Sequence, residues 1–241
     1  MSQNNCEKHS DTNHGSEYTN CERFTERCDS LMCSFDSIGE EIKKPSILLH
    51  SCCGPCSTSV VDRLLDEYDV TVYFYNPNIT DADEYARRLE AQMIFIEKFN
   101  ERTDVDGKIA FVAADYDPEH FFEFIKGLED EPEGGLRCVE CFRLRLIDTV
   151  EFALMNNYDY FTTTLSVSPH KNYEIISRLG SELALQHGIS FLNRDFKKAD
   201  GFARSIRLSK KYDLYRQNYC GCEGQYRSAG VRHDQLSSIL C

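Results

Sequence analysis

The stretch SILLHSCCGPC, residues 46–56, decides the fold and carries the first chemical signal. Its first six residues form a short apolar run, which predicts a buried β-strand. The Gly-Pro pair that follows ends the strand, and Ser57 or Thr58 can cap a helix that continues to Tyr68. A strand, a tight turn and a helix in this order predict the first unit of an α/β fold.

The same alternation continues along the chain. We expect further strands at 70–75, 109–114, 160–165 and 189–192, and helices at 81–100, from 118, and at 141–156, 169–187 and 201–219. This pattern predicts a Rossmann-like open parallel sheet with helices on both faces. In such sheets ligands bind beyond the carboxyl ends of the strands, where Cys52-Cys53, Asn76-Pro77-Asn78 and the segment 166–170 fall.

Length and composition indicate one folded domain. The chain has 241 residues, 41% of them hydrophobic, which suits a single α/β catalytic domain over residues 45–223. Residues 1–44 are mostly polar, so we expect a disordered extension there and a C-terminal tail at 224–241. No apolar run follows a basic start or approaches the ~20 residues of a membrane span, so we expect a cytoplasmic protein without membrane contact.

The charge is distributed unevenly. A formal net charge of −13 argues against a protein that coats nucleic acid nonspecifically. Between Arg194 and Arg216, however, eight basic residues stand against three acidic ones. Such a segment suits one docked polyanion, and a solvated helix face is the alternative interpretation.

Cysteines are unusually abundant, with 12 in the chain. Without an export signal, paired cysteines indicate metal ligands or catalytic thiols. Cys52-Cys53 and Cys138-x-x-Cys141 would together supply four thiolates, and the first two can reach one metal if the strand breaks at the Gly-Pro pair. Thiolates select an iron–sulfur cluster or zinc, which spacing alone does not separate. Buried structural cysteines are the other alternative.

Two further cysteine pairs suggest dithiol chemistry. Cys53-Gly-Pro-Cys56 matches the thioredoxin dithiol between a strand and a helix, although that interpretation leaves Cys138 and Cys141 unexplained. Cys220-Gly-Cys222 would form a strained, easily reduced disulfide, which suits a redox relay. Unrelated thiols or weak metal ligands are the alternative for this last pair.

In these motifs the chain resembles the epoxyqueuosine reductases of the QueH type, from about residue 47 to residue 223. The resemblance rests on LLHSCCGPC at 48–56, YNPNI at 75–79, EY with an arginine at 84–88, RCVECFR at 137–143, TTL with SPHK at 163–171, and DFKK through YCGC at 195–222.

The resemblance implies a function, cofactors and partners. It implies reduction of the cyclopentane epoxide of epoxyqueuosine in tRNA to the alkene of queuosine, with loss of water. It further implies a [4Fe-4S] cluster on Cys52, Cys53, Cys138 and Cys141, and a redox-active disulfide between Cys220 and Cys222. Partners would be a tRNA bearing epoxyqueuosine in its anticodon loop and an external electron donor. The sequence leaves open whether Cys56 touches metal and whether an additional iron or other metal ion lies beside the cluster.

Substrate contacts are expected at the strand ends and in the basic segment. The candidates are Asn76, Asn78, Tyr85, Arg143 and His170 near the strand ends, and Lys197, Lys198 and Arg204 for the anticodon arm. Two other functions fit parts of the sequence. One is a thioredoxin-like thiol-disulfide oxidoreductase that uses Cys53 and Cys56, and the other is a zinc-stabilised tRNA-binding module.

Overall fold

The computed structural model describes residues 43–105 and 107–222, which belong to one compact unit spanning Lys43–Cys241. Nearly all of the expected N-terminal extension and all of the expected tail lie outside the described residues. Among the described residues, no helix combines the length and apolar character that a membrane span requires.

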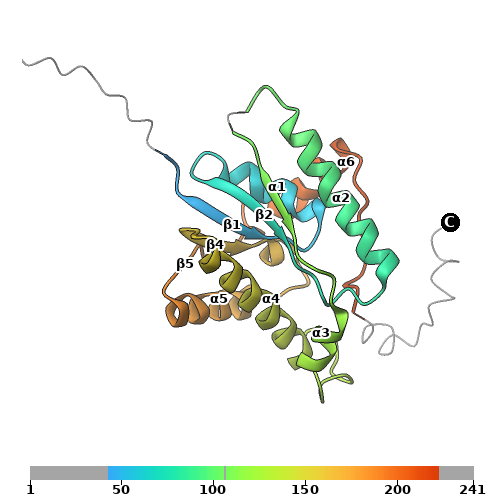
Figure 1. Ribbon diagram of the computed structural model, residues 1–241. Helices are drawn as coiled ribbons and strands as arrows, with labels where there is room; N and C mark the ends of the chain where they lie inside the picture. Colours follow the sequence, from blue (N-terminus) through green and yellow to red (C-terminus); the bar gives the residue numbers. More distant parts are fainter. Residues whose placement is uncertain (1–42, 106, 223–241) are drawn as a thin grey trace, which may run out of the picture. The chain divides into compact units, whose positions relative to one another are not determined.

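The core of the fold is a sheet of five strands (Figure 1). The strands are β1 (Ser46–His50), β2 (Asp69–Phe74), β3 (Ala110–Ala113), β4 (Tyr160–Thr163) and β5 (Ser190–Phe191). Their order is β3-β2-β1-β4-β5, and every neighbouring pair is parallel. The central β1 is almost wholly buried, as its continuous apolar run predicts.

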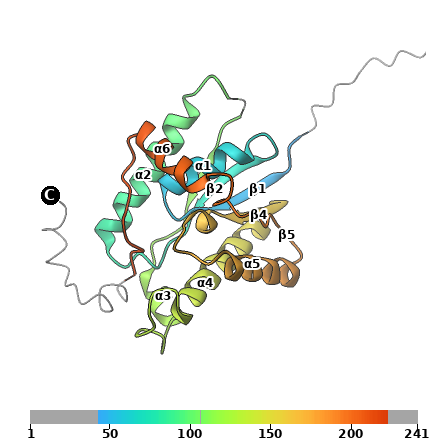
Figure 2. The ribbon, with the colours of Figure 1, turned by 180° about the vertical axis from the view of Figure 1, so that it is seen from behind.

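Helices cover both faces of this sheet, as Figures 1 and 2 show from opposite sides. They are α1 (Gly54–Leu64), α2 (Ala82–Asn100), α3 (Pro118–Phe124), α4 (Leu136–Met155), the 3₁₀ helix η1 (Thr164–Val167), α5 (Tyr173–His187) and α6 (Gly201–Lys211). On one face α1 packs against α2 and α6, and on the other α4 packs against α3 and α5. The predicted fold class, a Rossmann-like parallel sheet covered on both faces, is confirmed.

Several helix boundaries differ from the sequence prediction: α1 ends at Leu64 rather than Tyr68, α4 begins at Leu136 rather than at residue 141, and α5 begins at Tyr173 rather than at residue 169. Helix α1 begins at Gly54 rather than after Ser57, because proline is well tolerated in a first helical turn and Pro55 occupies that position. Helix α6 ends at Lys211 rather than continuing to residue 219. There Tyr212 turns into the core against Phe95, and Asp213 adopts a left-handed φ of 53°.

The topology places a crevice between β1 and β4. From β1 the chain moves outward through β2 to β3, and it then returns to β4 on the opposite side of β1. Ligands bind at such a switch point, beyond the carboxyl ends of the strands. Cys52 follows β1 there, and its N–H donates to the Thr164 hydroxyl at the start of η1 over 3.0 Å.

Gly54 allows α1 to approach α2 closely at this edge of the sheet. A Cβ at Gly54 would lie 2.6 Å from the Ala91 carbonyl oxygen, which belongs to the backbone of α2 and cannot rotate away. The close contact therefore requires glycine directly after Cys53.

Gly54→Ala should lower the free energy of unfolding by about 1–3 kcal/mol, measured by urea denaturation. Overpacking against the backbone outweighs the up to about 1 kcal/mol that alanine normally gains over glycine in a helix. Ser181→Ala, at an exposed site on α5, is the control and should change stability by less than about 0.5 kcal/mol. Equal free energies of unfolding for Gly54→Ala and Ser181→Ala would contradict the close approach of α1 to α2.

Candidate functional site

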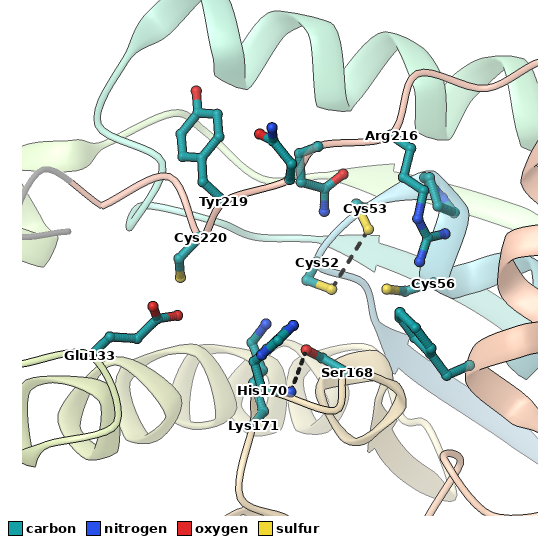
Figure 3. A pocket seen from close by; sticks show the side chains of 14 residues that line it. Cys52, Cys53, Cys56, Glu133, Ser168, His170, Lys171, Arg216, Tyr219 and Cys220 are labelled. Carbon is teal, nitrogen blue, oxygen red and sulfur yellow. Dashed lines mark hydrogen bonds between the residues drawn. The ribbon is translucent and has the colours of Figure 1, made fainter. Parts of the chain in front are cut away.

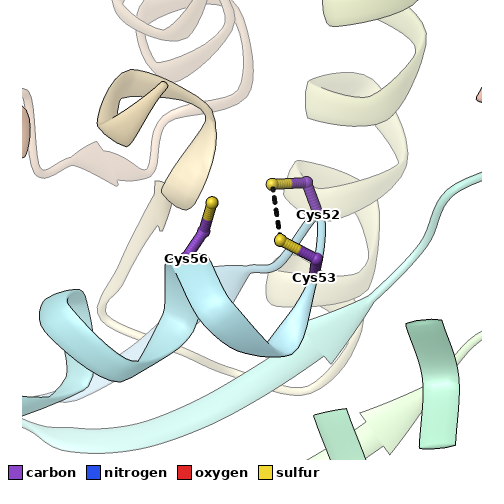
Figure 4. A group of neighbouring side chains, drawn as sticks. All are labelled: Cys52, Cys53 and Cys56. Atoms are coloured by element: carbon purple, nitrogen blue, oxygen red, sulfur yellow. Dashed lines mark hydrogen bonds between the residues drawn. The ribbon is translucent and has the colours of Figure 1, made fainter. Parts of the chain in front are cut away.

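Three cysteines converge at the junction of β1 and α1 (Figure 4). The sulfur atoms of Cys52, Cys53 and Cys56 all lie within 4.8 Å of one another, and all three side chains are buried. Cys52 and Cys53 come together because β1 ends at His50 and Cys53 serves as the extended N-cap residue of α1. Their Sγ atoms are 3.9 Å apart. This group can hold a metal ion.

The three thiols share negative charge unequally. Hydrogen bonds from Cys53, and then from Cys56, hold the pKa of Cys52 well below its usual value. The hydrogen bond to Cys52 raises the pKa of Cys53 to about 11, and hydrogen bonds to Cys52 and Cys53 raise that of Cys56. The group therefore favours one thiolate at Cys52, supported by two thiol donors.

The second expected ligand pair lies in the first turns of α4. Burial raises the pKa of Cys138, and it raises that of Cys141 to about 12. Negative charge at Cys220 acts on both sulfurs. Cys138 and Cys141 are not within the 4.8 Å group formed by the other three cysteines. A ligand set that joins Cys52 and Cys53 to this pair stays a prediction.

Cys220 and Cys222 lie at the end of the segment 212–222, here named the C-terminal strap, and no disulfide joins them to each other. A hydrogen bond from Cys222 lowers the pKa of Cys220 to about 5 despite burial, and charges on Lys171, Arg145 and Arg88 act in the same direction. The same hydrogen bond raises the pKa of Cys222. One nucleophilic thiolate beside one protonated thiol is the arrangement of an exchange-active dithiol.

A buried ion pair fastens the strap to α2. Arg88 donates from Nη1 to the Cys220 carbonyl over 2.8 Å and from Nη2 to that of Tyr219 over 3.1 Å. Its Nε donates to Glu84 over 2.6 Å, and the Tyr215 hydroxyl donates to the same carboxylate over 2.8 Å. Both Arg88 and Glu84 are buried. This contact fixes where Cys220 lies.

Positive charge lies among the cysteines, on the buried Arg145 and the half-buried Lys171. Arg145 is 2% exposed and donates to Asn76 Oδ1 over 2.5 Å, and it also hydrogen-bonds Cys141. Burial opposes the charge of Lys171, but negative charge on Cys220, Cys52 and Cys56 raises its pKa. Among the described residues, neither cation forms an ion pair with a carboxylate. Buried charges require compensation, so this environment fits an anionic thiolate-ligated group.

His50 is a neutral part of this environment. Burial, and then the charge of Arg145, lowers its pKa to about 3. Its Nε2 lies 3.1 Å from the Tyr75 carbonyl and 3.3 Å from Arg145 Nε, and it cannot donate to the first while accepting from the second. The shorter contact favours a proton on Nε2, with the Thr163 hydroxyl donating to Nδ1 over 2.8 Å. His50 therefore orders the strand ends.

A cavity of about 540 Å³ opens over these groups (Figure 3). Its lining comes from the junction of β1 and α1, Glu133 before α4, the segment before α5, α6 and the C-terminal strap, and includes Cys52, Cys53, Cys56, Lys171 and Cys220. In Figure 3 the strap passes on one side and His170 and Lys171 lie on the other, with the three grouped cysteines between them. The thiol group and the dithiol thus share one space.

The predicted contact residues near the strand ends lie at different depths. Asn76 is buried and bridges the Ser51 carbonyl and Arg145. Asn78 is also buried and lines a small cavity beside Cys220. Tyr85 packs against Tyr116 with the two rings tilted by 35°, and Arg143 pairs with Glu140 over 3.2 Å. Tyr85 and Arg143 line neither of these two cavities.

The basic candidates lie at the outer edge of the site. His170 lines the main cavity and also a neighbouring one of about 460 Å³, which Lys197 and Lys198 line as well. Arg204 forms an ion pair with Asp62 of α1, so its charge is already engaged.

Sequence reasoning missed several residues of the site. The missed residues are Arg88, Arg145, Lys171, Arg216 and Gln217. A signal existed for two of them: Arg145 follows Cys141 by one helical turn, and Lys171 follows His170. The other three, Arg88, Arg216 and Gln217, belong to the site because of the path of the strap. That path was not predicted, because a helix was expected to continue to residue 219.

These features define an α/β protein with a thiol-lined, cation-flanked cavity at the carboxyl edge of a parallel sheet. The family model described as "Epoxyqueuosine reductase QueH" matches residues 47–227. Relatives of that name are similar over much of their length. The Staphylococcus epidermidis protein is 41% identical over 81% of this chain and 82% of its own. The Streptococcus pyogenes protein is 42% identical over 80% of this chain and 74% of its own length. The Thermotoga maritima protein is 29% identical over 80% of this chain and 96% of its own length.

The chain belongs to the epoxyqueuosine reductase QueH family. It is therefore an oxidoreductase of queuosine biosynthesis, as the resemblance of its motifs predicted.

Arg88→Met should lower the free energy of unfolding by about 3–5 kcal/mol, because it leaves the buried Glu84 carboxylate without its main partner. Hydrogen exchange at the amides of residues 219–221 should also become faster than in the unmodified protein. Arg87→Met is the matched control, since Arg87 pairs with the same carboxylate but its side chain is 51% exposed. Arg87→Met should lower the free energy of unfolding by less than about 1 kcal/mol. Equal losses in the two variants would contradict a stabilising buried contact between Arg88 and Glu84.

Proposed function

We propose that this chain reduces the cyclopentane epoxide of epoxyqueuosine in tRNA to the alkene of queuosine. The observation that carries the proposal is the cavity lined jointly by Cys52, Cys53, Cys56, Cys220 and Lys171. Family membership supplies the reaction class, and the cavity supplies thiols and a cation where a reducible substrate would bind.

The reaction needs two electrons and two protons. Both C–O bonds of the epoxide break, the C=C bond forms, and the oxygen leaves as water after taking up the two protons. Oxidation of the Cys220–Cys222 dithiol to a disulfide releases two electrons and two protons, which balances the reaction. An external electron donor then restores the dithiol.

We propose a [4Fe-4S] cluster held by Cys52, Cys53, Cys138 and Cys141, with Cys56 and an additional iron or other metal ion as further components. Arg145, which is buried, and Lys171, which is half-buried, form no ion pair with a carboxylate among the described residues and fit such an anionic group. When bound, a cluster of this type supplies single electrons at low potential. Lys171 Nζ lines the same space, where its positive charge would stabilise negative charge developing on the epoxide oxygen.

Two other functions are less well supported. A thioredoxin-like oxidoreductase would use Cys53 as its attacking thiolate, but Cys53 is 1% exposed and the hydrogen bond to Cys52 raises its pKa to about 11. A zinc-stabilised binding module would use the same thiols without turnover. Membership of the epoxyqueuosine reductase family favours epoxide reduction over both.

The direct test is an anaerobic assay on tRNA that carries epoxyqueuosine, with mass analysis of the modified base. We expect the loss of one oxygen atom from the base. An unchanged mass with iron-loaded protein and a chemical reductant would refute the proposed reaction.

Cysteine variants separate the metal site from the dithiol. Cys52→Ala and Cys141→Ala should lose bound iron and all turnover, because each removes a proposed cluster ligand. Cys222→Ala should retain iron but turn over slowly. Iron and sulfide analysis with the visible spectrum measures the first effect, and single-turnover kinetics the second. Cys241→Ala, outside the residues matched by the family model, is the control and should retain both properties. Full iron content in Cys141→Ala would refute the proposed ligand set.

Binding of the tRNA can be tested through its salt dependence. Lys197→Gln with Lys198→Gln should weaken binding and reduce the slope of log K against log salt by about one to two, because each lysine would neutralise one phosphate. Arg204→Gln should have a smaller effect, since Arg204 pairs with Asp62. Arg178→Gln, an exposed position on α5, is the matched control. An unchanged slope in the double variant would contradict tRNA binding at these lysines.

A further inference from the structure

Two polar side chains that line the main cavity each carry a buried atom without a hydrogen-bond partner among the described residues. Arg216 Nη1 and Gln217 Oε1 are buried without a hydrogen bond, and both residues line the cavity. A buried donor or acceptor without a partner is costly, so such atoms indicate a ligand that supplies the missing bonds. The pair offers one donor and one acceptor from adjacent positions of the strap.

The surroundings of these atoms restrict the ligand further. The Arg216 guanidinium lies over the Phe202 ring, 5.2 Å from its centroid, and this ring also lines the cavity. The Gln217 side chain hydrogen-bonds Cys53. Since Oε1 is the Gln217 atom without a partner, the bond to Cys53 comes from the amide nitrogen, which leaves Oε1 for the ligand. Figure 3 shows Arg216 beside Cys53 and Cys56 at this cavity.

A planar heterocycle that carries a carbonyl next to a ring N–H would supply an acceptor for Arg216 and a donor for Gln217. The Watson–Crick edge of a guanine-type base presents the O6 acceptor beside the N1–H donor, whereas adenine presents the reverse order. Bases removed from a stack are read by hydrogen bonds to this edge and by contact with aromatic or guanidinium planes. An anion such as phosphate would use Arg216 but would oppose the Gln217 carbonyl.

We propose that Arg216 and Gln217 are specificity-determining residues that hold the Watson–Crick edge of a guanine-type base, with Arg216 donating to O6 and Gln217 accepting from N1–H. This inference rests on the proposed function, because the family resemblance implies that the base of epoxyqueuosine is derived from guanine. The reacting substituent is attached to the five-membered ring, so the recognised edge remains available. Binding by this edge would place the base in the cavity that Cys52 and Cys220 line.

The test compares two anticodon stem-loop RNAs that differ only in guanosine or adenosine at the target position. Anaerobic fluorescence anisotropy with the iron-loaded protein should show tighter binding of the guanosine RNA. Gln217→Met and Arg216→Met should each reduce this preference by about tenfold, as expected for one lost hydrogen bond to a buried partner. Gln186→Met and Arg178→Met, both exposed on α5, are the matched controls and should keep the preference.

Three results would overturn the inference: no preference for guanosine in the unmodified protein, a full preference in both variants, or an equal loss of affinity for both RNAs. Iron content is measured in parallel and should be unchanged in Gln217→Met, which separates base recognition from damage to the metal site. The epoxyqueuosine assay separates this inference from the proposed function. If the unmodified protein removes the oxygen while the variants keep their base preference, only the base-recognition inference fails.

Discussion

The buried charge of Arg145 organises the carboxyl edge of the sheet. Its guanidinium donates to Asn76 Oδ1 and hydrogen-bonds Cys141 on its own helix, and among the described residues it forms no ion pair with a carboxylate. Burying a cation without a carboxylate is costly in isolation, and the thiols around it are the groups that can carry the compensating negative charge. Arg145 thereby links α4 to the ends of β1 and β2 and makes the site suited to anionic sulfur chemistry.

A second constraint is the path of the chain after α6. Helix α6 stops where Tyr212 enters the core, and the strap then returns across the cavity to the start of α2. Arg88 holds the backbone of Tyr219 and Cys220 there, and Thr80 N–H donates to the Gly221 carbonyl over 3.1 Å. These contacts bring a C-terminal dithiol to the same cavity as the cysteines that follow β1. The strap also presents Arg216 and Gln217 to the space between them.

Much of the fold could be predicted because its signals are local. Apolar runs mark β1, β2 and β4, and their alternation with helices implies parallel strands and a site at the carboxyl edge. The boundaries of α1 and α6 were wrong for physical reasons. Pro55 looked like a helix breaker although it suits a first turn, and the periodicity beyond Lys211 gave no sign that the core would draw Tyr212 inward. Of the site, the cysteines were predictable from their pairing, whereas Arg88 was not, because charged residues on helices normally face water.

The sequence by itself determined the family, the α/β alternation and the presence of paired thiols, because these depend on residue type and short spacing. Only the tertiary structure decided which of these groups meet. Cys56 joins Cys52 and Cys53 because α1 begins directly after them, and Cys220 reaches the same cavity because Arg88 and Glu84 form a buried pair. Contacts between residues more than a hundred positions apart depend on how the sheet and its helices pack. Local sequence patterns do not predict such contacts.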